Sequence, residues 1–154
     1  MPRTRRTRVI SAAPDEVWRL ISDPHHQPRW WPGVQRVEGV GEDSFTQVHQ
    51  TKKGRAVRLD FTVEGSDPGV RQQWRQELEG TPFARVLGEA LTEITLSSHP
   101  GGTEVTIEQR QRLRGYSRTG GVLFRRATRR RLDEALDGVE LAVGSGPEER
   151  GSPG

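Results

Sequence analysis

Residues 9–41, VISAAPDEVWRLISDPHHQPRWWPGVQRVEGVG, decide the fold of this chain. The stretch predicts the end of one strand, two short helices and the start of a second strand. Pro14 suits the first turn of a helix, because its missing N–H would have no partner there. Val17, Leu20 and Ile21 follow at helical spacing and give this helix a short apolar face.

A second short helix follows directly. Helical backbone angles are disfavoured before a proline, so Asp23-Pro24 ends the first helix. Asp23 can then cap the second helix, with Pro24 at its first position and Pro32-Gly33 at its end. The conspicuous side chains of this helix are His25, His26, Trp30 and Trp31. Adjacent histidines point in different directions and do not form the i, i+4 pair of a zinc site, so we expect no metal.

Beyond this stretch the apolar period changes to two, which is typical of strands. Strands are predicted over residues 3–10, 34–40, 44–52, 57–64, 70–79, 86–96 and 104–113. Short, turn-rich connections, such as Lys53-Gly54, indicate an antiparallel meander with one face buried. A helix of roughly 35 Å is predicted over residues 118–143. Its expected apolar stripe is Val122, Leu132, Ala135, Leu136, Val139 and Ala142 or Val143.

Composition sets the outer limits. The chain has 154 residues, 31% of them hydrophobic, so its core is small for its length and fits a hollow interior. Because it has no cysteine, disulfides and thiolate metal sites are excluded. No apolar run is long enough for membrane insertion or a signal peptide, and we expect a cytoplasmic location. We expect one domain over residues 1–143 and a disordered tail over residues 144–154.

Several short motifs carry a resemblance to a known superfamily. They are Ala13-Pro14-Asp15-Glu16-Val17-Trp18, Ser22-Asp23-Pro24, Arg29-Trp30-Trp31-Pro32-Gly33, Gly101-Gly102-Thr103-Glu104-Val105-Thr106 and Leu132-Asp133-Glu134-Ala135-Leu136. With this order of elements, the chain resembles the START/Bet v 1-like (SRPBCC) superfamily, and within it bacterial single-domain proteins of the polyketide cyclase/dehydrase type. The resemblance implies an α+β helix-grip fold: a seven-stranded curved antiparallel sheet wrapped around the long C-terminal helix, with an elongated cavity between them.

The predicted inner face of the sheet carries several amides among its aliphatic side chains. A buried amide without a partner costs a few kcal/mol, so glutamines there fit a surface that faces water or the oxygens of a ligand. The alternative is that these positions lie near strand ends or that a register slip turns them outward. The predicted ligand-binding residues are Gln72, Trp74, Gln76, Gln109, Gln111, Leu59, Phe61, Thr92, Trp30 and His49.

No acid or base falls clearly on this inner face. Ring closure in a cyclase benefits from a positioned base or oxyanion donor, and His49 is the only candidate on a strand, with an ambiguous side assignment. We therefore expect non-catalytic binding of a hydrophobic small molecule, such as a polyketide, lipid or isoprenoid-like compound. The alternative is a polyketide cyclase/aromatase-like enzyme acting in the same cavity. We expect no cofactor, and a monomer or homodimer.

An arginine cluster marks the long helix. Its members are Arg125, Arg126, Arg129, Arg130 and Arg131. A basic run of this kind can contact nucleic acid, an anionic membrane or a protein partner. Asp133, Glu134 and Asp137 follow one turn on, and no nucleic-acid-binding motif accompanies the cluster. We therefore interpret it as a solvated helix face and expect no nucleic-acid partner.

Overall fold

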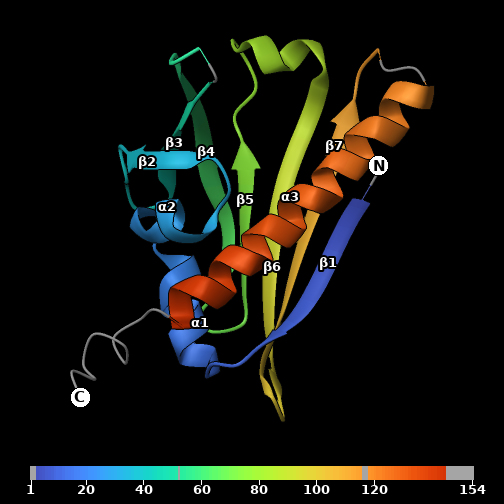
Figure 1. The fold of residues 1–154 in the computed structure, drawn as a ribbon. Helices are drawn as coiled ribbons and strands as arrows, with labels where there is room; N and C mark the ends of the chain where they lie inside the picture. The colour runs from blue at the N-terminus through green and yellow to red at the C-terminus, as the bar shows by residue number, and fades with distance from the viewer. Residues whose placement is uncertain (1–2, 52, 116–117, 145–154) are drawn as a thin grey trace.

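The computed structural model describes residues 3–51, 53–115 and 118–144. A seven-stranded antiparallel sheet, in the order β1-β7-β6-β5-β4-β3-β2, curves around one long helix (Figure 1). The strands are β1 (Arg3–Ile10), β2 (Val34–Glu38), β3 (Ser44–Gln50), β4 (Ala56–Asp67), β5 (Arg71–Gln76), β6 (Leu87–His99) and β7 (Gly102–Leu113). The helices are α1 (Pro14–Ser22), α2 (Gln27–Trp30) and α3 (Arg118–Gly144), with short 3-10 turns η1 (Pro24–His26) and η2 (Pro82–Arg85). The predicted helix-grip fold is confirmed.

The predicted caps and turns explain the local boundaries. Asp23 accepts a hydrogen bond from the backbone N–H of His25 at 3.0 Å, which starts the second helical segment as expected. Gly54, at φ 80°, donates its N–H to Thr51 O at 2.9 Å and closes the β3–β4 hairpin. Gly144, which was expected to begin the disordered tail, is the last residue of α3. The rest of the predicted tail, residues 145–154, lies outside the described residues.

Alternation along the strands holds in the core and fails at one bulge. Ile94, Leu96, Val105 and Ile107 alternate along β6 and β7 and are buried on the inner face. At the start of β6 the register with β7 shifts between Leu87 and Glu89, so Leu87 turns inward where the regular alternation predicted Gly88. A bulge adds one residue to a strand and reverses the side of those before it.

The two halves of α3 have different surroundings. The C-terminal half buries Leu132, Ala135, Leu136, Val139 and Ala142 against the core formed with α1 and the sheet. The N-terminal half buries only Thr128 among the side chains described there. The expected place of Val122 on the buried stripe was wrong, because this half of the helix stands off the sheet and leaves Val122 48% exposed.

Close contacts fix the C-terminal half of α3. A Cβ on Gly138 would lie 2.2 Å from the carbonyl oxygen of Trp30, so only glycine permits the observed approach of α2 to α3. Arg29 Nη2 donates to the carbonyl oxygen of Ala142 at 3.2 Å in the same region. From the other side, Arg6 on β1 pairs with Asp133 at 3.3 Å.

The convex face of the sheet is covered by ion pairs. Glu108 lies on this face as predicted, yet it is 5% exposed because Arg5 and Arg110 cover it, at 2.8 and 2.6 Å. Burial alone would raise the pKa of Glu108, but the hydrogen bonds from Arg110 and Arg5 outweigh it and hold that pKa below its ordinary value. None of the described helices is long and apolar enough to cross a membrane.

Candidate functional site

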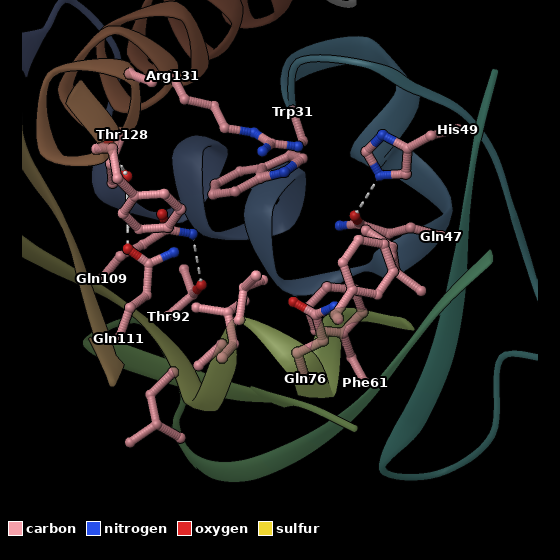
Figure 2. A pocket seen from close by; sticks show the side chains of 18 of the residues that line it. Trp31, Gln47, His49, Phe61, Gln76, Thr92, Gln109, Gln111, Thr128 and Arg131 are labelled. Atoms are coloured by element: carbon pink, nitrogen blue, oxygen red, sulfur yellow. Dashed lines mark hydrogen bonds between the residues drawn. The ribbon is translucent and has the colours of Figure 1, made fainter. Parts of the chain in front are cut away.

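A cavity of about 400 Å³ lies between the N-terminal half of α3 and the concave face of the sheet (Figure 2). It exists because the N-terminal half of α3 stands away from strands whose inward side chains there include the small Ala90. The volume lies in the usual range for small-molecule sites. The lining residues are Trp31, Gln47, His49, Val57, Leu59, Phe61, Gln76, Phe83, Val86, Leu87, Ala90, Leu91, Thr92, Gln109, Gln111, Phe124, Ala127, Thr128 and Arg131.

The structure brings together most of the residues predicted to bind a ligand. Those that line the cavity are Leu59, Phe61, Gln76, Thr92, Gln109, Gln111 and His49. Gln72, Trp74 and Trp30 do not appear in its lining, although all three are buried. Gln72 and Trp74 lie on the part of the inner face that α1 and α2 cover, and Trp30 is the last residue of α2 itself, with its ring centroid 6.2 Å from that of Trp74.

Gln72 and Trp74 are held by local partners. Trp74 Nε1 donates to Gln72 Oε1 at 2.9 Å, and Gln72 Nε2 donates to the carbonyl oxygen of Ser22 at 3.4 Å. The amide of Gln72 therefore accepts a hydrogen bond from the indole N–H of Trp74 and donates one to the last backbone carbonyl of α1. Alternation identified the correct face for both residues, but it does not distinguish the packed end of that face from the hollow end.

An aromatic cluster forms one wall of the cavity. The ring centroids of Trp31 lie 5.5 Å from those of both Trp30 and Trp74. Phe45 and Phe61 stack with their centroids 5.1 Å apart. Trp31 and Phe61 face the cavity, whereas the other three rings pack behind them. Trp30 and Trp31 therefore pack the short helices onto the sheet.

A chain of polar side chains runs along the β3 side. Gln47 Nε2 donates to Gln27 Oε1 at 2.7 Å, and Gln47 Oε1 lies 2.9 Å from Nε2 of His49 (Figure 2). Because Gln47 Oε1 can only accept, a neutral His49 carries its proton on Nε2 in this arrangement. Gln47 and His49 both face the cavity, which settles the side assignment that the sequence left ambiguous.

Burial lowers the pKa of His49 below its ordinary value, and the positive charge of Arg131 lowers it further. The ring is therefore neutral at neutral pH. Gln27 is the innermost of the three hydrogen-bonded side chains His49, Gln47 and Gln27. Its Nε2 is buried without a hydrogen-bond partner among the described residues.

Arg131 is the cavity residue that sequence reasoning missed. Its assignment to the solvated face of α3 was wrong in part: the residue keeps exposed surface, but its side chain lines the cavity and extends over it (Figure 2). Burial by the surrounding protein lowers the pKa of Arg131, and the negative charge of Glu134 offsets this only in part. Helical spacing contained the missing signal, because Phe124, Thr128 and Arg131 continue the buried stripe toward the N-terminus at steps of four and three.

Hydroxyl and amide groups line the side of the cavity opposite Gln47 and His49 (Figure 2). Gln109 Nε2 donates to Thr92 Oγ1 at 3.0 Å, and the Thr128 hydroxyl donates to the carbonyl oxygen of Phe124 at 2.9 Å. Thr128 Oγ1 also lies 3.5 Å from Gln111 Oε1. These contacts leave part of the amide hydrogen-bonding capacity directed at the cavity.

The two histidines of the helical entry lie elsewhere. Nδ1 of His25 contacts Asp23 Oδ1 at 2.9 Å, and Nδ1 of His26 contacts the carbonyl oxygen of Arg19 at 3.0 Å. Asp23 is the carboxylate nearest to both rings, with its Oδ2 3.9 Å from Nε2 of His26. Across the described ranges, no three His, Asp or Glu side chains gather in a way that could hold a metal ion.

Comparison with known families and structures gives consistent results. A family model described as "Polyketide cyclase / dehydrase and lipid transport" matches residues 1–144. The di-domain ARO/CYC BexL from the BE-7585A biosynthetic pathway matches with a TM-score of 0.78 and 23% identity, over 96% of this chain and 48% of that one. This chain thus spans about half the length of that protein.

Two proteins of comparable length share the fold. One from Thermus thermophilus matches with a TM-score of 0.72 and 22% identity, over 94% of this chain and 98% of that one. One from Chromobacterium violaceum matches with a TM-score of 0.68 and 19% identity, over 92% and 96%. Identities this low show the fold alone. No curated protein sequence matches the chain significantly.

Proposed function

Because the chain belongs to the polyketide cyclase/dehydrase and lipid transport family, we propose that its cavity binds a hydrophobic small molecule without transforming it. The compound class is a polyketide, lipid or isoprenoid-like molecule. The supporting observation is a cavity of about 400 Å³ whose lining combines aromatic and aliphatic side chains with a few amides and hydroxyls. This combination is typical of sites that bind by apolar burial and orient the ligand through a small number of polar contacts.

Apolar contact supplies most of the proposed affinity. A ligand that buries about 300 Å² of apolar surface gains roughly 7 kcal/mol from burial. Association costs several kcal/mol, so apolar burial of this size alone supports dissociation constants near the millimolar range. Gln76, Gln109 and Gln111 are proposed to fix the orientation through ligand oxygens. Gln76 is free for this role, since its side chain makes no hydrogen bond within the described part of the chain.

A cavity-filling substitution tests the proposal. Ala127 lines the cavity on α3 and keeps exposed surface, so Ala127→Trp fills the space without displacing a packed side chain. We expect the uncharged probe N-phenyl-1-naphthylamine to bind the native protein and to bind Ala127→Trp at least tenfold more weakly, measured by isothermal titration calorimetry. Thermal unfolding checks that the variant folds.

Val122→Trp is the matched control, because Val122 lies on the same helix outside the cavity lining. It is expected to leave probe affinity unchanged. Equal binding by native protein and Ala127→Trp would place the probe elsewhere and contradict the proposal.

A second candidate function is aldol-type ring closure in the same cavity. Two side chains favour it. The neutral ring of His49 can accept a proton, and the guanidinium of Arg131 can stabilise an enolate. The two groups are close enough for the charge of Arg131 to lower the pKa of His49. In such a step, His49 takes a proton from a carbon next to a carbonyl group, the carbanion forms a carbon–carbon bond to a second carbonyl carbon, and the resulting alkoxide takes up a proton. The hydroxyl group formed in this way leaves as water when the ring aromatises. Mass spectrometry of a linear poly-β-carbonyl thioester incubated with the protein distinguishes the two functions: binding alone leaves the compound unchanged, whereas ring closure followed by aromatisation lowers its mass by one water molecule.

A further inference from the structure

We propose that the ligand of this cavity carries a carboxylate and that Arg131 binds it. This inference rests on the proposed function, since it names the chemical class of the molecule held there. The ligand would thus be an amphiphile, with an anionic head near Arg131 and His49 and an apolar body along the rest of the cavity.

The first argument is the contrast between Arg131 and the arginines of the sheet. Several on the convex face are paired: Arg5 and Arg110 with Glu108, and Arg75 with Glu64 at 2.9 Å. Arg131 makes no hydrogen bond or ion pair with any residue that the structure describes, and its nearest opposing charge effect comes from Glu134 on its own helix. A partly desolvated cation without a counter-ion is unfavourable, and a bound anion removes that cost.

The second argument is the charge of the lining. Among the described lining residues there is no Asp or Glu, and Arg131 and His49 are its only ionisable side chains. Because His49 is neutral at neutral pH, the cavity holds one positive charge. A carboxylate has one negative charge and two oxygens that match the fork of a guanidinium. A phosphate dianion would require further cationic side chains, which the described lining does not supply.

The third argument is the polarity along the cavity. Phe124 lies seven residues before Arg131, about 10 Å along the helix axis. Phe124 belongs to an apolar cluster separate from the main core. This cluster includes Phe83, Val86 and Leu87, which all line the cavity. The cavity therefore has a cationic end and an apolar end, as an amphiphile requires.

Matched ligands test the inference. Decanoate and 1-decanol share one alkyl chain and differ in the head group. A hydrogen-bonded charge pair contributes about 1.5–3 kcal/mol, so we expect the native protein to bind decanoate about 10- to 100-fold more tightly than 1-decanol. Isothermal titration calorimetry at neutral pH measures both constants.

Two substitutions locate the preference. Arg131→Met removes the charge and keeps an unbranched side chain, and it is expected to reduce the preference to less than threefold without weakening 1-decanol. Arg130→Met changes net charge equally at an exposed neighbour and is expected to keep the preference. Arg131→Lys retains a point charge and should keep part of it, which guards against a folding defect in the methionine variant.

The outcomes separate the two proposals. If the native protein binds both compounds equally, or if Arg131→Met retains the preference, the carboxylate assignment is overturned while binding in the cavity stands. If neither compound binds the native protein, the proposed function fails and the inference fails with it.

Discussion

His49 shows how one side chain makes stability depend on pH. Its ordinary pKa near 6.5 applies to the unfolded chain, whereas burial and the charge of Arg131 lower the pKa in the folded protein. Between the two values the unfolded chain binds more protons than the native one. Stability contributed by the neutral ring is therefore fully present above the unfolded pKa and falls as pH decreases below it.

We expect the free energy of unfolding of the native protein to fall between pH 7 and pH 5, by at most about 1.4 kcal/mol per pH unit for one titrating group. His49→Gln keeps an amide hydrogen-bonding group and should flatten this slope. Urea unfolding at several pH values measures both. The lowered pKa values of Asp23, Glu38 and Glu108 place their titration below this window. Parallel curves for the two proteins would show that His49 does not control the slope.

Single residues also mark the limit of sequence interpretation. Alternation put Gln72 and Gln76 on the same face of β5, and both are on it. Gln72 meets Ser22 and the indole of Trp74, whereas Gln76 meets the cavity. The difference depends on where α1 ends over the sheet, which no local pattern encodes. Arg131 was misplaced for another reason: its type suggested a solvated face, while its helical spacing from Phe124 and Thr128 indicated the inner one.

At the scale of elements, the approach of α2 to α3 depends on Gly138. Alanine is the better helix former by about 1 kcal/mol. Its Cβ, however, would lie 2.2 Å from the backbone oxygen of Trp30, and backbone cannot move aside as a flexible side chain can. The two effects oppose each other, and the steric one is the larger.

We expect Gly138→Ala to lower the free energy of unfolding by about 1–3 kcal/mol, the usual cost of overpacking. Gly121→Ala on the same helix is the control, because nothing lies within 4 Å of the Cβ it would add. It should stabilise the protein by up to about 1 kcal/mol. Chemical denaturation of both variants provides the comparison. Equal shifts of the same sign would mean that α2 yields to the extra methyl group.

The order and type of the elements were predictable because each has a strong local pattern. The proline-capped helices of residues 9–41, the alternating strands and the long final helix were all predicted, and the strand ends differ by a few residues. What the patterns lack is the spacing between layers. Val122 fits the stripe of α3 by periodicity, yet it is exposed because that half of the helix stands off the sheet.

The whole molecule therefore divides along α3. The C-terminal half lies beside α1 and α2 (Figure 1) and is held by buried contacts to them and to the sheet. The N-terminal half spans the cavity. Local opening is easiest where few apolar contacts are buried. The fold and the binding site thus depend on different halves of one helix.

Hydrogen exchange tests this division. We expect amides of residues 121–131 to exchange at least tenfold faster than those of residues 132–142 in the ligand-free protein. Decanoate should slow the first segment and leave the second nearly unchanged, because only the first roofs the cavity. Exchange followed by mass spectrometry resolves the two segments. Uniform protection along the helix would contradict the division.

The aromatic wall has a further consequence for the optical behaviour of the protein. Trp30, Trp31 and Trp74 lie with ring centroids 5.5 to 6.2 Å apart. At such separations, excitation energy passes between indoles faster than they emit light, so the three rings act as one chromophore. Of these three, only Trp31 touches the cavity. A quenching molecule that enters the cavity and contacts Trp31 therefore lowers the fluorescence of all three tryptophans.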